Sequence, residues 1–183
     1  LELAVLGDSP KVKPLQDDVR EMHHMLEAYL AFVRGDEGEA ATLTNVAQLA
    51  AEVAQATGRS GGTVTLGTLP EQPVRLRANA FRRLLANVLA NAVRHGSRVE
   101  MAGMIRDDRL WLHVDDNGPG IPPESREEVF KPFVRLDPAR TLDATGSGLG
   151  LAIARDIAQS HGGDIGLEDS PLGGLRVAIK VPV

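Results

Sequence analysis

Alternating glycines at Gly146, Gly148 and Gly150 precede an apolar segment with helical spacing, and Ser147 and Leu149 fill the positions between them. Glycine lets a backbone approach a ligand closely, and the first turn of a helix offers unpaired N–H groups and the positive end of its dipole. This combination favours an anion such as phosphate, although a tight turn explains the glycines equally well. The polar segment before the run is not the buried strand of a dinucleotide fold, and the chain has no Gly-Lys-Ser/Thr sequence of a Walker loop.

Asn87 and Asn91 stand one helical turn apart in segment 79–95, whose apolar residues recur at helical spacing. Both amides border the apolar stripe of this predicted helix. Asparagine is a weak helix former, so a purely structural helix would more often carry Glu, Lys or Gln there. Amide oxygens suit Mg²⁺, which takes its other ligands from water and phosphate. For this helix alone, two solvated amides are an equal alternative.

Asp116 lies at the end of a predicted strand and is followed by Gly118 and Gly120. A carboxylate at this point can accept a hydrogen bond from an exocyclic amine, while the glycines leave room for a flat base. The sequence Asp-Asn-Gly-Pro is also typical of a turn, and by itself it favours the turn.

The chain has 183 residues, which is long enough for one domain and an appendage. Its hydrophobic fraction of 43% is typical of a globular protein. The net charge of −5 argues against nucleic acid or an anionic membrane as the main partner. The chain has no cysteine, which excludes disulfides and thiolate metal sites. It begins without Met inside an apparent amphipathic segment, so we expect it to be part of a longer protein.

Apolar residues at alternating spacings of four and three predict a heptad helix near the N-terminus, suited to a helical hairpin or a dimeric bundle. Segment 34–39 then interrupts the pattern as a linker. We therefore expect a helical piece over 1–38 and a separate domain over 39–183. The heptad residues are Leu15, Val19, Met22, Leu26, Tyr29 and Val33.

Helices and strands alternate with hairpins in the domain, which predicts a mixed sheet covered by helices on one face. A hairpin is expected around Asp107-Asp108, and the long segment 131–147 without periodicity is expected to form a functional lid. The predicted helices are 45–56, 79–95, 124–129 and 150–161, and the predicted strands are 42–43, 63–66, 74–76, 99–105, 110–115, 165–168 and 175–181.

Four sequence boxes follow one another in a characteristic order. They are Asn87-x-x-x-Asn91, Asp116-x-Gly118-x-Gly120, Phe130-Lys131-Pro132-Phe133 and Gly146-x-Gly148-Leu149-Gly150. In this order the chain resembles, over 41–183, the catalytic domain of sensor histidine kinases from two-component systems. The resemblance implies an α+β two-layer sandwich of the Bergerat type, shared with gyrase, Hsp90 and MutL. The heptad helix resembles the second helix of that family's dimerisation and phosphotransfer hairpin.

The resemblance implies ATP and Mg²⁺ as ligands and gives the predicted helix 79–95 several roles. Asn87 would ligate the metal, and Asn91 would contact metal or phosphate. Arg94 would neutralise phosphate charge. His95, where family members often have an aromatic residue, could pack against the adenine.

The base is expected to lie beside the second box. Asp116 would accept from the adenine N6 amine, Gly118 and Gly120 would leave room for the ring, and Ile121 would adjoin it. The pair Gly173-Gly174 occupies the place of the family's last glycine box.

Phe130 and Phe133 would anchor the lid, within which Arg135 and Arg140 are candidates to reach the γ-phosphate. The expected catalytic residues are thus Asn87, Asn91 and Arg140. The phosphates would be cradled by the run Gly146, Ser147, Gly148, Leu149 and Gly150.

By the same resemblance, the domain would transfer the γ-phosphate of ATP to a histidine that precedes Leu1, for relay to an aspartate of a response regulator. His23 and His24 are on the wrong helix to replace that acceptor. The expected partners are the protein's own hairpin, a second copy in a homodimer and the response regulator, with no nucleic acid. The chain would be the cytoplasmic portion of a bacterial membrane sensor.

Two other kinds of protein share part of this pattern. An anti-sigma-factor Ser/Thr kinase shares the Asn and Gly boxes but lacks the preceding hairpin, so the heptad pattern argues against it. An ATPase clamp of the Hsp90 and MutL type usually carries a Glu that activates water on the Asn helix. No carboxylate lies between Ala78 and His95, which argues against hydrolysis as the main task.

Overall fold

The structure is a computed structural model that describes residues 38–58, 63–136 and 148–183. The predicted heptad helix, His23 and His24 lie outside the described residues. So do three predicted site residues, Arg140, Gly146 and Ser147.

A five-stranded mixed sheet has the order β2-β4-β5-β7-β6. The β2 strand runs parallel to β4, and each remaining neighbouring pair is antiparallel. A separate antiparallel pair joins β1 to β3. The strands are β1 (Thr42–Thr44), β2 (Val64–Leu66), β3 (Val74–Leu76), β4 (Val99–Arg106), β5 (Arg109–Asp116), β6 (Asp164–Asp169) and β7 (Leu175–Pro182).

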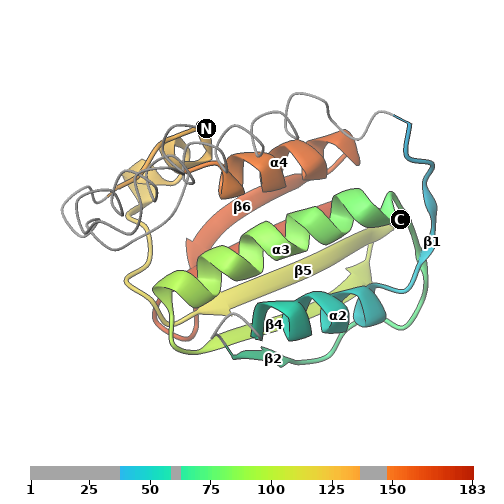
Figure 1. Cartoon of the computed structure of the whole chain (residues 1–183), viewed down its shortest axis with the longest axis horizontal. Helices are drawn as coiled ribbons and strands as arrows, with labels where there is room; N and C mark the ends of the chain where they lie inside the picture. The colour runs from blue at the N-terminus through green and yellow to red at the C-terminus, as the bar shows by residue number, and fades with distance from the viewer. Residues whose placement is uncertain (1–37, 59–62, 137–147) are drawn as a thin grey trace, which may run out of the picture.

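Helices α2 (Val46–Gly58), α3 (Ala78–His95) and α4 (Gly150–Ser160) cover one face of this sheet, with α3 between the other two (Figure 1). The predicted two-layer arrangement of a mixed sheet and one helical layer is therefore confirmed. The α3 helix packs against both neighbouring helices and against β5, so it forms the centre of the domain.

Side chains of β5 alternate between the two faces of the sheet. Leu110, Leu112 and Val114 lie on the face that packs against the helices and are fully buried. The β4–β5 hairpin turns at Asp107 and Asp108, which have φ values of 52° and 53°. Two consecutive left-handed residues are typical of the type I′ turn that matches strand twist, as the hairpin predicted here requires.

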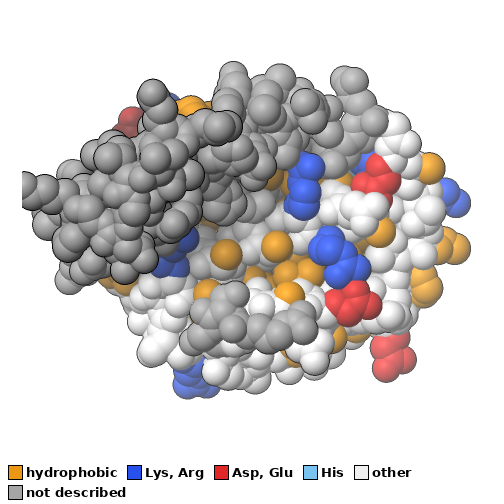
Figure 2. All heavy atoms as spheres, in the orientation of Figure 1, with side chains coloured by type: hydrophobic (Ala, Val, Ile, Leu, Met, Phe, Trp, Pro, Cys, Tyr) orange, Lys and Arg blue, Asp and Glu red, His pale blue; other side chains and the backbone are white. Residues whose placement is uncertain are grey.

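The apolar stripe of α3 fixes the rotation of that helix. Its largest side chains, Phe81, Leu84, Leu85 and Leu89 among them, have no exposed surface. On the opposite side α3 exposes alanines between basic side chains, visible as orange atoms among blue ones in Figure 2. Any polar residue at the edge of the stripe is therefore held at a fixed angle.

The helix predicted over 124–129 is wrong, because the structure has two short 3₁₀ turns there, Pro123–Ser125 and Glu128–Phe130. A segment this short forms too few α-helical hydrogen bonds to offset the cost of nucleation, and 3₁₀ turns close with fewer residues. Within the described ranges, no helix has the length and apolarity needed to cross a membrane.

Candidate functional site

Asp116 is a buried carboxylate at the end of β5, with 1% of its surface exposed. Its Oδ1 atom accepts hydrogen bonds from the backbone N–H of Gly118 at 2.8 Å and of Leu175 at 3.1 Å. Among the described residues Oδ2 receives no such bond. The carboxylate is thus held by one oxygen and presents the other as an acceptor.

The neighbouring Asp115 has a different role. Its two oxygens form a bidentate pair with Arg176 on β7, at 2.8 and 2.9 Å. Hydrogen bonding to Asp115 raises the pKa of Arg176. Asp115 therefore links β5 to β7 through both of its oxygens, whereas Asp116 keeps Oδ2 without a hydrogen bond from the described residues.

Glycines close around Asp116 because side chains have no room there. A Cβ on Gly174 would lie 2.4 Å from Asp116 Oδ1, and one on Gly118 would lie 2.7 Å from the carbonyl oxygen of His95. Gly120 has a left-handed φ of 70°. The sequence predicts that Gly118 and Gly120 leave room for the base, and what the structure shows is that both are needed for the shape of the loop.

Asn87 is oriented by its own helix. Its Nδ2 donates to the carbonyl oxygen of Arg83 at 3.0 Å, so Oδ1 points away from that bond. A Cβ built on Gly150, the first residue of α4, would lie 3.5 Å from this Oδ1. Asn91 is half-buried one turn further along α3. An amide oxygen of α3 thus faces the backbone at the start of α4.

The two ends of the predicted lid meet at the base of α4. The N–H of Phe133 donates to the carbonyl oxygen of Gly148 at 3.0 Å, and a Cβ on Gly148 would lie 2.9 Å from the Phe133 carbonyl carbon. Leu149 is buried. The two predicted anchors differ, since Phe130 is 8% exposed and Phe133 is 54% exposed, with a left-handed φ of 67°. Only Phe130 is anchored by burial in the core.

Basic groups gather where α3 ends and the lid begins. Desolvation, followed by the charge of Arg135, lowers the pKa of Arg94. Desolvation and then the charge of Arg94 lower the pKa of His95, while Asp116 opposes this shift. The charge of Arg135 therefore acts on Arg94, so two of the predicted phosphate-binding residues contribute positive charge to the same region.

Two arginines without a recognisable sequence pattern, Arg126 and Arg155, fix the segment between Asp116 and the lid. Arg126 donates through Nε to the carbonyl oxygen of the partly buried Ile121 at 3.0 Å. Arg155 on α4 lies 4.4 Å from the ring centroid of Phe130 and donates to Glu127 at 2.8 Å. The partners of Arg155 are distant in sequence, so no local pattern indicates them.

A metal site made of protein ligands alone is not present in the part of the chain that the structure describes, where no group of three or more His, Asp or Glu could hold an ion. The donor set instead fits Mg²⁺ bound by one amide oxygen together with phosphate and water.

Residues 77–183 match the protein family described as histidine kinase-, DNA gyrase B- and HSP90-like ATPase. The chain belongs to this family. Asp116, both asparagines and the glycines of the site all lie within the matched range, whereas 38–76 lie outside it. The family resemblance inferred from the four boxes is therefore confirmed.

Among curated relatives, the chain is 34% identical over 185 residues to the sensor histidine kinase CpxA of Escherichia coli (strain K12), covering 97% of this chain and 40% of that protein. It is 32% identical over 186 residues to the sensor histidine kinase GtrS of Pseudomonas aeruginosa, covering 100% of this chain and 38% of that protein. The chain thus spans about two fifths of the length of these relatives.

Among solved structures, the ATP-binding domain of PrrB from Mycobacterium tuberculosis superposes with a TM-score of 0.66 at 29% identity. The match covers 78% of this chain and 97% of that one. Fold and family match agree that this is an ATP-binding domain of the histidine kinase-, DNA gyrase B- and HSP90-like type, and the two curated relatives named above are sensor histidine kinases from bacteria.

Proposed function

We propose that the kinase domain binds ATP with Mg²⁺ and transfers the γ-phosphate to a histidine on a dimerisation and phosphotransfer hairpin. The observation that carries this proposal is the combination of a fixed, buried carboxylate at Asp116 with the Asn87 oxygen that faces the start of α4. One element can recognise a base, and the other can hold a metal beside phosphate.

Asp116 accepts from the adenine N6 amine through Oδ2, because Oδ1 already receives two backbone N–H groups. This arrangement selects adenine over guanine, which carries an acceptor oxygen at the equivalent position. The buried carboxylate would lose a hydrogen bond with the wrong base.

Asn87 serves as a metal ligand through Oδ1, and Asn91 contacts metal or phosphate. Mg²⁺, when bound, neutralises charge on the phosphate oxygens during transfer. Arg94 and Arg135 hold the phosphates by charge. The N–H groups at the start of α4 face the same region, with Gly148 and Gly150 keeping that backbone accessible.

For the whole protein we propose an architecture that follows the sequence expectations. Residues 1–38 belong to the hairpin and 39–183 form the ATP-binding domain. The complete protein would act as a homodimer, pass phosphate to an aspartate of a response regulator, bind no nucleic acid and place this domain on the cytoplasmic side of a bacterial membrane.

Incubation with γ-labelled ATP and Mg²⁺ tests the transfer directly. A separate polypeptide with a histidine-bearing hairpin of a sensor kinase should acquire an acid-labile, base-stable label, and the domain itself should not. A domain that binds ATP but labels no hairpin, and releases inorganic phosphate instead, would show that it is an ATPase.

A further inference from the structure

The N-terminus of α3 has no cap from its own segment. Its N-cap residue is Arg77, which makes no side-chain capping bond, and the first turn contains no acidic residue. A helix start leaves several backbone N–H groups without partners, and a basic side chain at this end opposes the helix dipole. The cap must therefore come from elsewhere.

Glu39, 40 residues earlier in the chain, provides this cap. Its Oε1 accepts from the N–H of Asn79 at 2.8 Å, and its Oε2 accepts from the N–H of Ala80 at 3.1 Å. Glu39 lies in the segment that leads from the linker into β1, outside the range matched by the family. Its half-buried carboxylate thus ties the linker to the start of α3.

Arg77 makes a second connection at the start of α3. We call the contacts of Glu39 and Arg77 together the joint. The Arg77 Nη2 donates to the carbonyl oxygen of Ser160 at 2.7 Å and to Ser160 Oγ at 2.6 Å, at the C-terminal end of α4. The Arg77 N–H donates to His161 Nε2 at 3.2 Å. A cation is favoured at a helix C-terminus, so the guanidinium that cannot cap α3 stabilises the end of α4.

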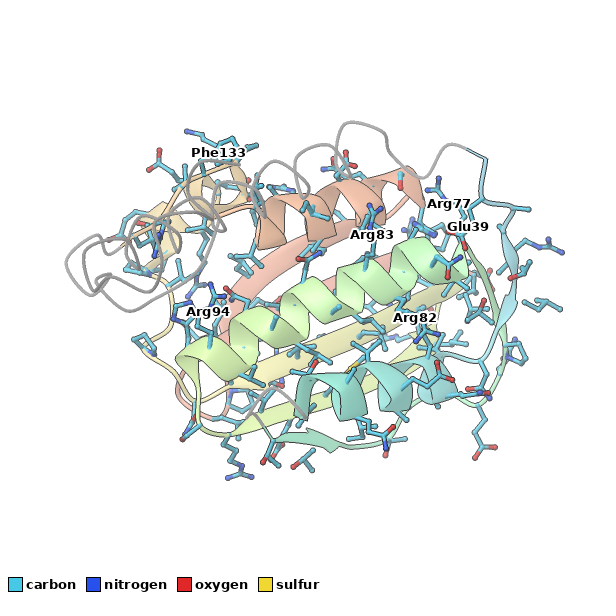
Figure 3. All side chains as sticks on the ribbon, in the orientation of Figure 1. Glu39, Arg77, Arg82, Arg83, Arg94 and Phe133 are labelled. Carbon is cyan, nitrogen blue, oxygen red and sulfur yellow. The ribbon has the colours of Figure 1, made fainter. Side chains whose placement is uncertain are left out.

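The joint lies at the opposite end of α3 from the nucleotide site. Figure 3 shows Glu39 and Arg77 together at one end of that helix and Arg94 at the other. Because α3 carries Asn87 and α4 begins at Gly150, any shift between these helices changes both sides of the site.

We propose that Glu39 is a positioning residue that couples the linker to the nucleotide site through α3. When the carboxylate is seated on Asn79 and Ala80, α3 and α4 hold the arrangement that binds nucleotide, and displacement of the linker weakens binding. This inference rests on the proposed nucleotide site. It adds a residue at the opposite end of α3 that influences nucleotide affinity.

Three variants of the full chain test the proposal. Glu39→Ala should weaken Mg-ATP affinity roughly three- to tenfold, and Glu39→Gln, which keeps one acceptor oxygen, should have an intermediate effect. The control is Glu71→Ala, which removes the same charge from an exposed loop residue and should bind as wild type. Glu39→Gln also serves if Glu39→Ala does not fold.

Amide exchange at Asn79 and Ala80 distinguishes coupling from simple capping. These first-turn groups have no partner within the helix, so their protection reports on Glu39 directly. Coupling is reciprocal, so saturating Mg-ATP should slow their exchange in wild type by about the factor that Glu39→Ala costs in affinity.

Unchanged affinity in both Glu39 variants, or exchange at these amides that nucleotide does not alter in wild type, would overturn the coupling. Failure of wild type to bind Mg-ATP would instead refute the proposed function. In that case the exchange rates without nucleotide would still show whether Glu39 caps α3.

Discussion

At the scale of single residues, the site depends on which atoms are already engaged. Asp115 and Asp116 are adjacent and chemically identical, yet Arg176 takes both oxygens of one and two backbone N–H groups take a single oxygen of the other. Strand alternation sends their side chains to opposite faces of the sheet. Asp115 therefore has no oxygen left for a ligand, and Asp116 is the carboxylate that can accept a hydrogen bond from one.

Replacement of either asparagine should weaken nucleotide binding without loss of the fold. Asn87→Ala and Asn91→Ala should each lower Mg-ATP affinity about tenfold or more, which is about 1.4 kcal/mol, because both lie at the edge of the buried stripe. The Asn87 effect should shrink when Mg²⁺ is removed. Calorimetry with and without Mg²⁺, together with thermal unfolding, provides the measurement. Lower stability with unchanged affinity would indicate a structural role.

His95 should make the domain less stable in acid. Its pKa is below the ordinary value of 6.5 in the folded state, so the unfolded chain takes up this proton first as the pH falls. Well above pH 6.5, His95 is neutral in both states and does not affect the free energy of unfolding. As the pH falls through 6.5 toward the folded pKa, protonation of the unfolded chain lowers that free energy progressively. Urea unfolding at pH 8 and pH 5 should therefore show a smaller acid loss for His95→Gln. Equal losses in the two proteins would contradict the shift.

Sequence patterns could identify residues whose partner is a ligand or a close neighbour, but not residues held by distant contacts. Asp116 was recognisable from its position at a strand end before glycines. Arg176, 61 residues from Asp115, had no local signal. The steric need for Gly174 also arises only when β7 is paired beside β5.

At the scale of elements, two arginines hold the short 3₁₀ segment between the base site and the lid. Arg126 connects it to Ile121 and to Asp169 on β6. Arg155 connects it to α4 through Phe130 and Glu127. These contacts explain how a segment with little regular hydrogen bonding holds its conformation.

Arg155 should contribute more than its ion pairs. Glu127 is 82% exposed at its side chain, whereas that of Arg155 is 23% exposed, so the stacking on Phe130 is better shielded than the salt bridge. Arg155 also pairs with Asp164 at 3.1 Å. Arg155→Ala should cost about 1–2 kcal/mol of unfolding free energy, and Glu127→Gln and Asp164→Asn each less than about 0.5 kcal/mol. Urea titrations of the three variants measure this difference. A summed cost of the two carboxylate variants equal to that of Arg155→Ala would mean that the ion pairs dominate.

Helices with a clear apolar stripe were predictable, and short polar segments were not. The apolar stripe of segment 79–95 was enough to predict α3, and it also predicted that the asparagines lie at the edge of the buried face. The segment 124–129 had acidic residues typical of a helix start but too few residues to sustain one. Its conformation is set by contacts outside the segment, which Arg126 makes with Ile121 and Asp169 and which Arg155 of α4 makes with Glu127.

At the scale of the molecule, the site forms where the end of β5, the C-terminal half of α3 and the start of α4 converge on one side of the domain (Figure 1). The order of the four sequence boxes predicted which elements contribute. It could not predict that α3 would be capped by Glu39 from the linker, because that contact joins residues 40 positions apart. Glu39 and the start of α3 are thereby joined directly.

Asp116 should select adenine through Oδ2, the oxygen that accepts no hydrogen bond from the described residues, and a calorimetric titration of wild type with ATP and with GTP, both with Mg²⁺, tests this most directly. ATP should bind more tightly by about 1–3 kcal/mol, the cost of an unpaired buried polar group. Asp116→Asn should fold, since its Oδ1 still accepts both backbone N–H groups, but its amide donor should abolish or reverse the preference. Equal affinity of wild type for ATP and GTP would contradict the account.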